Sequence, residues 1–229
     1  MTTSMRIMDA TYGDYAVVSE QDAKHDACML HAEQPERAVR ACYSVHTIRV
    51  YQAYSAPIAD AALAAGTFVP PFKRERMTWL KPSFRWMAYR CGYASKPGQE
   101  RVLAIDITRE GFHWALERAV LSHFVPAVHG DSDTWAAQVK TSPVRVQWDP
   151  ERDLFHRPLT HRSIQVGLRG EAVRRYVQEW ITGISDVTDL MRNVGAHVAS
   201  GNIEQASALL PAERPYPLPE DLVSRLNAG

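Results

Sequence analysis

Hydrophobic and polar positions along the chain first mark out segments with the two-residue period of a β-strand. In residues 47–54, Ile48 and Val50 fall on one expected face and Arg49 on the other. Residues 101–107 are almost continuously apolar, which is typical of a central strand. These patterns predict strands at residues 47–54, 76–80, 101–107, 144–148 and 163–168.

Apolar positions three and four residues apart predict helices between these strands. The longest such stripe runs through residues 170–184. Ser83 and Thr108 stand where a side chain can cap the first turn of the helix that follows. The helices predicted are residues 34–43, 57–65, 84–91, 109–122, 135–140, 170–184 and 186–198, and the proline-rich residues 210–219 are expected to be extended.

Strands and helices are interspersed without the steady β-α-β rhythm of a doubly wound sheet. We therefore predict an α+β fold, with a mixed, mainly antiparallel sheet as its core and helices on its flanks. The expected organisation is an N-terminal extension over residues 1–35, a single catalytic or binding domain over residues 36–219, and a C-terminal tail over residues 220–229.

Composition narrows the class of protein without naming an activity. The formal net charge is +0, so attraction to nucleic acid requires a local basic patch. The 3 cysteines form no C-x-x-C pair, which favours a reducing compartment. No apolar run reaches the length of a signal peptide or a membrane span, so we expect a cytoplasmic protein with no membrane partner. The oligomeric state stays open.

Residues 72–90 combine positive charge with aromatic rings. The stretch holds six cationic and five aromatic residues, and Glu75 is its only acid. Cationic groups bind phosphates, and aromatic faces stack on bases or on nicotinamide. The stretch is therefore predicted to line a site for a nucleotide or nucleic acid. A buried amphipathic segment with a solvated basic rim would show the same composition.

A second group of candidate residues follows the predicted strand at residues 144–148. Gln147, Asp149 and Glu151 alternate in sequence, so they share a face if the backbone stays extended. A fixed carboxylate beside an aromatic residue suits stabilisation of an oxocarbenium-like transition state, or hydrogen bonding to ribose hydroxyls. The alternative is a surface turn in which Asp149 caps the next residues and Glu151 pairs with an arginine.

Several common catalytic patterns do not occur in the sequence. The 9 histidines are scattered without the H-x-x-x-H or H-E-x-x-H spacing of metal ligands, so no metal site is expected. There is no G-x-S-x-G, no G-x-G-x-x-G and no Walker lysine loop. The remaining candidates are therefore the basic–aromatic stretch and the acidic motif.

Five motifs together resemble the family of domain of unknown function 4291. They are Thr47–Tyr54 (TIRVYQAY), Arg76–Met87 (RMTWLKPSFRWM), Gln99–Ile107 (QERVLAIDI), Val146–Asp153 (VQWDPERD) and Glu213–Pro219 (ERPYPLP). The resemblance covers about residues 37–219. It implies a single compact domain and brings no established reaction with it.

The order of elements also resembles the ADP-ribosyltransferases, especially those that modify DNA and RNA. This resemblance implies a split sheet, NAD as substrate, and transfer of ADP-ribose to nucleic acid or a nucleotide. Glu151 would be the catalytic glutamate, which stabilises the oxocarbenium ion and orients the acceptor. Family members often carry Gln or Glu two residues before it, where this chain has Asp149, and Gln147 lies four residues before it. Asp149 is therefore the alternative key carboxylate. The residues that would contact NAD are Arg49, Tyr51, Arg76, Thr78, Trp79, Lys81, Ser83 and Trp86.

Two other interpretations stay open from the sequence. A non-catalytic module would bind a nucleotide or nucleic acid through residues 72–90. Its phosphate contacts would be Lys81, Arg85 and Arg90, and its base-stacking residues would be Trp79, Phe84 and Trp86. In a purely structural interpretation, the tryptophans are core residues and the cations surround them.

Overall fold

Two sheets carry the fold of residues 35–229, the part of the chain that the computed structural model describes. The first sheet has the order β2 (Thr47–Tyr54), β4 (Arg101–Thr108) and β8 (Ile181–Asp186). Both pairings are antiparallel, and β2 and β4 pair along their whole length. The N-terminal extension expected from the sequence falls almost wholly outside the described residues.

The second sheet has the order β3 (Thr78–Leu80), β7 (Pro158–Leu168), β6 (Val144–Arg152) and β5 (Ala119–Leu121). Only β5 and β6 are parallel within it. The two sheets meet where the Tyr51 N–H donates to the carbonyl of Lys81, with N and O 2.7 Å apart. The predicted α+β fold with a mixed, mainly antiparallel sheet is confirmed.

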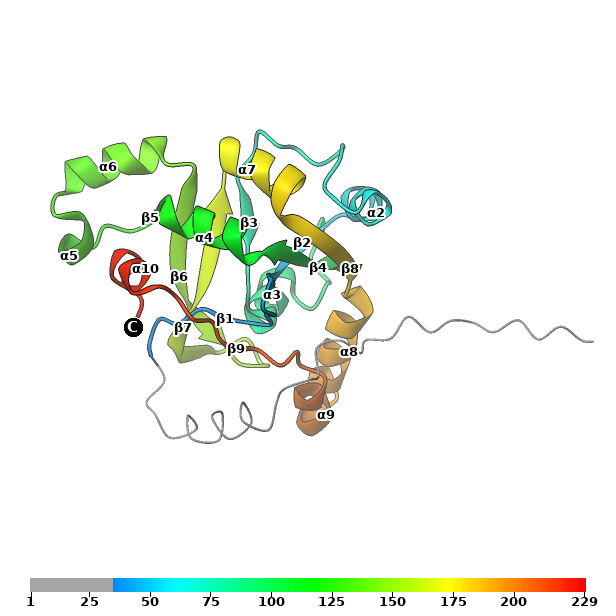
Figure 1. Ribbon diagram of the computed structural model, residues 1–229. Coiled ribbons are helices and arrows are strands. Elements are labelled where there is room, and N and C mark those ends of the chain that lie inside the picture. The colour runs from blue at the N-terminus through cyan, green and yellow to red at the C-terminus, as the bar shows by residue number, and fades with distance from the viewer. Residues whose placement is uncertain (1–34) are drawn as a thin grey trace, which may run out of the picture. The chain divides into compact units, whose positions relative to one another are not determined.

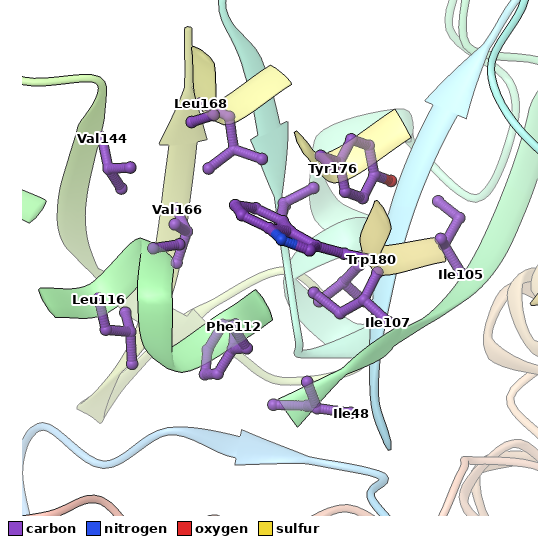
Figure 2. Packing of buried hydrophobic residues seen from close by; sticks show 14 of the residues in the cluster. Ile48, Ile105, Ile107, Phe112, Leu116, Val144, Val166, Leu168, Tyr176 and Trp180 are labelled. Carbon is purple, nitrogen blue, oxygen red and sulfur yellow. The ribbon is translucent and has the colours of Figure 1, made fainter. Parts of the chain in front are cut away.

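The main core lies between α4 (Arg109–Glu117) and the inner faces of both sheets. The Thr108 hydroxyl caps this helix by accepting a hydrogen bond from the Gly111 N–H. Phe112 and Leu116 of α4 lie near Val144, Val166 and Leu168 of the second sheet, as Figure 2 shows. The same view places Trp180 above Ile107 of the first sheet, so one apolar layer connects the two sheets.

A second core lies under α3 (Phe84–Cys91), on the other side of β2. Ser83 caps this helix through the Trp86 N–H, as the sequence predicts. The core is completed by α8 (Thr188–Ala199) and α9 (Ile203–Ala208). Its buried members include Tyr51, Phe84, Met87, Cys91, Val102, Met191 and Val194.

The remaining helices lie at the periphery of this arrangement. α2 (Ala56–Ala65) contacts β4 and β8, and it ends at Gly66 in a left-handed conformation, as expected from the sequence. α5 (Pro126–His129) and α6 (Ser132–Thr141) extend from the β5 side of the second sheet (Figure 1).

The C-terminal segment crosses the front of the molecule in the view of Figure 1. Its strand β9 (Arg214–Pro215) pairs with β1 (Arg40–Ala41). The segment expected as a tail, residues 220–229, contains α10 (Glu220–Arg225) and places Leu222 and Leu226 in the main core. This segment is therefore part of the packed structure.

Three of the predicted helices are wrong in whole or in part. Residues 40–41, inside the expected helix 34–43, form β1 because the C-terminal segment supplies a partner strand. The helix predicted over residues 109–122 ends at Glu117, and β5 follows it. The β-branched and apolar residues 119–121 fit either structure, and pairing with β6 decides for a strand.

The helix predicted over residues 170–184 is divided into three elements. They are α7 (Glu171–Arg175), the π-helical turn η1 (Tyr176–Trp180) and strand β8. Ile181 and Ile184 continue the apolar stripe of the predicted helix. They form a strand instead, because they pair with the edge of β4. Tertiary pairing overrides the local helical period here.

Candidate functional site

The second sheet has one apolar face and one polar face. Val146 and Ile164 point into the main core, so their neighbours along β6 and β7 point the other way. Gln147 is opposite Gln165, and Asp149 is opposite Ser163. We define the polar face as Trp79, Lys81, Gln147, Asp149, Glu151, Ser163 and Gln165.

Asp149 is fixed by amide donors on both of its oxygens. Gln147 Nε2 donates to Oδ1 over 2.8 Å along the same strand. Gln165 Nε2 donates to Oδ2 over 2.5 Å from the neighbouring strand. Each carboxylate oxygen can accept further hydrogen bonds, and Asp149 is only half-buried. Its carboxylate is therefore both oriented and accessible.

Glu151 is held differently, although it lies on the same face. The β6–β7 register shifts between Pro150 and Arg152, so Glu151 sits at an irregularity in the ladder. One carboxylate oxygen accepts from the Arg152 N–H over 2.8 Å, and the other accepts from the Ser163 hydroxyl. Glu151 is 1% exposed. Its geometry suits a positioning role better than direct contact with a substrate.

Lys81 lies at the junction of the two sheets and is 8% exposed. Its Nζ donates to the Trp79 carbonyl over 3.3 Å. Burial lowers the pKa of Lys81 to about 7, with a further lowering by Arg90, while Asp149 acts in the opposite direction. Lys81 is thus an amine that can exchange a proton near neutral pH, in the electrostatic range of Asp149.

Trp79 supplies an aromatic surface on the polar face. It pairs with Gly167 of β7, and an added Cβ at Gly167 would lie 3.0 Å from its indole ring. Glycine at this position therefore leaves room for the indole against the strand. Trp79 remains half-buried, so part of its ring stays accessible.

Helix α3 borders the polar face with cations and aromatic rings. The Arg152 guanidinium lies 4.1 Å from the Tyr89 ring centroid and 5.6 Å from that of Trp86. Trp86 is 4% exposed, so these rings mainly hold the hairpin of β6 and β7 to the helix. Arg90 is exposed, and Arg85 is half-buried. These two arginines are the candidates to meet an anionic substrate.

The C-terminal segment brings a further acid to the start of α3. Glu213 Oε1 accepts from the Phe84 N–H over 2.5 Å. Burial raises the pKa of Glu213 to about 8, the Phe84 hydrogen bond opposes this, and Glu151 raises it again. Arg40 and Arg85 lie close enough to lower the same pKa. A cavity of about 160 Å³ lies here between Arg85, Glu213, Phe84, Leu210 and Pro211.

The residues expected to hold NAD do not all lie together. Arg49 lies on the same face of β2 as Tyr51. It forms a bidentate salt bridge with Asp106, with Nε 2.9 Å from Oδ1 and Nη2 2.8 Å from Oδ2. Ser83 is 2% exposed and acts as the helix cap. Thr78 and Arg76 line a separate cavity beside β3. Of the residues expected to contact NAD, Trp79 and Lys81 lie on the polar face together with the three candidate catalytic residues.

Sequence reasoning missed Ser163 and Gln165, which complete the polar face. Both alternate with Ile164 and Val166 in a strand whose other side chains are buried. Polar residues at every second position of such a strand were the available signal. Sequence reasoning set residues 213–219 beside the basic–aromatic stretch as part of a charge-complementary cleft, but it did not select Glu213 as a site residue.

Within residues 35–229, no group of three or more His, Cys, Asp or Glu side chains is placed to hold a metal ion. In the same part of the chain, no helix is both long and apolar enough to cross a membrane.

Comparison with protein-family models gives a match over most of the described residues. Residues 38–216 match a family model described as Domain of unknown function (DUF4291). This is the family that the five sequence motifs resemble. A search of the curated proteins finds no relative.

Proposed function

The chain belongs to the DUF4291 family, and we propose that it is an NAD-dependent ADP-ribosyltransferase that acts on nucleic acid or a nucleotide. The observation that carries the proposal is the Asp149 carboxylate, oriented on both oxygens by Gln147 and Gln165 and still accessible. Such a group is prepared for a reaction in which positive charge develops beside it.

The proposed chemistry is cleavage of the bond between nicotinamide and ribose. The electrons of that bond pass to the nicotinamide nitrogen, nicotinamide leaves, and the ribose carbon acquires oxocarbenium character. Asp149 stabilises that charge, as a carboxylate does in glycoside hydrolysis. An acceptor hydroxyl or nitrogen then bonds to the ribose carbon and gives up its proton, and Lys81, with its pKa lowered to about 7, is the group proposed to take it.

The solvent exposure of each residue near Asp149 indicates the role that we propose for it. Trp79 is half-buried and offers a ring for stacking with nicotinamide, whereas Trp86 is 4% exposed and serves the packing of α3. Arg85 and Arg90 are the cations available for the pyrophosphate. Glu151 acts through Ser163, so it is a positioning residue in this proposal.

The direct test incubates the full chain with NAD and single-stranded DNA or RNA oligonucleotides. Nicotinamide release is measured by chromatography, and the oligonucleotide is examined by mass spectrometry for an added ADP-ribose. We expect nicotinamide release that increases when the acceptor is present. Absence of both NAD binding and NAD turnover would overturn the proposal.

A non-catalytic binding module is the second candidate, and one observation favours it. Lys73, Arg74, Arg76 and Arg90 are all exposed within the basic–aromatic stretch 72–90. Such a surface binds nucleic acid with an affinity that falls steeply as salt increases. Salt-dependent oligonucleotide binding without NAD turnover would favour this candidate over the transferase.

A further inference from the structure

A cavity of about 370 Å³ lies beside the start of β3. Thr78 lines it, whereas the next residue, Trp79, points to the polar face. The volume lies in the range of small-molecule sites, which is roughly 300–1,000 Å³. The cavity is lined by Tyr54, Ile58, Pro71, Phe72, Lys73, Arg76, Met77, Thr78 and Gly98.

The floor of the cavity carries a hydroxyl hydrogen that lacks an acceptor within residues 35–229. Tyr176 donates to Gln52 Oε1, and Gln52 Nε2 donates to Thr78 Oγ1 over 2.6 Å and to the Trp79 carbonyl. This fixes the direction of the Gln52 amide and makes Thr78 an acceptor. A single hydrogen bond of 3.0 Å joins the hydroxyl groups of Thr78 and Tyr54, and it uses only one of their two hydroxyl hydrogens.

Whichever residue donates in that bond, the other keeps a hydrogen that no neighbour accepts. Thr78 is 6% exposed, and both residues line the cavity. A donor in this position is costly to leave unpaired. The floor is therefore built to receive a hydrogen-bond acceptor, and the buried Gln52 and Tyr176 hold the pair rigid.

The walls and the mouth of the cavity specify the rest of the ligand. Ile58, Phe72 and Met77 supply apolar contact, and Phe72 adds an aromatic ring. Lys73 and Arg76 are exposed, and neither pairs with an acid within the described residues. A flat ring with an acceptor on its edge and an anionic group at its far end matches this order of groups.

We propose that this cavity binds a nucleoside monophosphate, at a site separate from the polar face. The base enters between Ile58 and Phe72, and one of its carbonyl or ring-nitrogen acceptors takes the spare hydrogen of Tyr54 or Thr78. The phosphate lies between Lys73 and Arg76. This site does not depend on NAD chemistry at Asp149.

Calorimetric titration of the full chain with AMP, GMP, CMP and UMP tests the proposal. The nucleoside of each monophosphate and ribose 5-phosphate are the truncated probes, because the first lacks the phosphate and the second lacks the base. We expect at least one monophosphate to bind. Its nucleoside and ribose 5-phosphate should each bind at least about tenfold more weakly. No binding of any monophosphate, or equally tight binding of ribose 5-phosphate, would overturn it.

Variants locate the binding site. Ile58→Trp adds a large side chain to the cavity wall from α2, changes neither residue of the hydroxyl pair, and is expected to abolish binding. Thermal melting without ligand verifies that it folds. Lys73→Gln and Arg76→Gln are each expected to weaken binding by about tenfold. Lys140→Gln, on α6, is the matched control. Loss of monophosphate binding in Asp149→Asn, or unchanged binding in Ile58→Trp, would place the ligand elsewhere.

Discussion

Gln165 donates a hydrogen bond to Asp149 across the β6–β7 ladder, with Nε2 and Oδ2 2.5 Å apart. The two residues are diagonal neighbours, because Gln165 pairs with Gln147 and Asp149 pairs with Ser163. This bond orients the carboxylate from the opposite strand, while Gln147 holds it from its own strand. The carboxylate therefore cannot turn without breaking a bond to one of the two strands.

Loss of that bond is expected to impair catalysis as well as folding stability. In Gln165→Ala, Asp149 keeps the Gln147 bond but loses the cross-strand one, which is worth about 1.5–3 kcal/mol for a charged acceptor. We expect kcat for nicotinamide release to fall by about tenfold or more, with KM for NAD changed much less. A variant in which only KM changes would show that Gln165 contacts the substrate directly.

The stability of the protein is expected to depend on pH through Glu213. Its pKa is about 8 in the folded chain, against an ordinary value of 4.5, so the folded state holds a proton that the unfolded state releases. This contribution is fully present below pH 4.5 and is lost as the pH rises to about 8. Glu213→Gln keeps an acceptor for Phe84 and does not titrate.

Urea denaturation of both proteins across this window measures the effect. The wild type should lose stability relative to Glu213→Gln between pH 4.5 and about 8, and the difference should then stay constant. Glu220→Gln, at the exposed start of α10, is the control and should show no such change. A difference that is independent of pH would contradict the burial of this carboxyl group.

Lys81 is expected to make the folded protein more stable as the pH rises, which is the opposite of the effect of Glu213, and to do so at higher pH. Its pKa is about 7 in the folded chain, against 10.5, so between these values the unfolded state binds a proton that the folded state lacks. Stability from this group therefore rises with pH across that range. The advantage of Lys81→Met over wild type should be largest below pH 7 and should shrink towards pH 10.5.

Thermal melting at several pH values checks this expectation. Lys140→Met, on the surface of α6, is the control and should keep a constant offset from the wild type. If Lys81→Met also keeps a constant offset, Lys81 has an ordinary pKa and cannot take the acceptor's proton in the way proposed.

Gly111 is expected to be essential for the packing of α4. A Cβ added there would lie 2.3 Å from Cγ of Trp180, so Gly111→Ala must displace the indole from the main core. We expect a loss of about 1–3 kcal/mol in the free energy of unfolding, measured by urea denaturation. Gly183→Ala is the matched control, because nothing lies within 4 Å of its added Cβ. Equal stability of the two variants would contradict the close contact.

Strands whose two faces differ could be predicted from the sequence. Ile48 and Val50 enter the main core while Tyr51 enters the second core, as the alternation in residues 47–54 predicts. The caps Ser83 and Thr108 were also found, because a hydroxyl before an apolar run is a local signal. These features depend on neighbours in sequence.

The features that depend on distant partners could not be predicted. Ile181 enters β8 instead of a helix because β4 lies beside it, and its local spacing fits both structures. Glu213 reaches Phe84 only because β9 pairs with β1. The shared face of Gln147, Asp149 and Glu151 was expected from alternation. The same alternation along the predicted strand 76–80 could also have separated Thr78 from Trp79.

The most direct test compares nicotinamide release by Asp149→Asn with that by Asp133→Asn, an exposed acid of α6. Asparagine keeps the shape of the side chain but removes the negative charge opposite the developing oxocarbenium ion. We expect NAD turnover in the presence of oligonucleotide to fall by about 100-fold or more in Asp149→Asn. A melting curve verifies that this variant folds, because its amide nitrogen faces one of the two glutamine amides. Asp133→Asn should keep the wild-type turnover. Wild-type turnover in a folded Asp149→Asn would contradict the proposed role of this carboxylate.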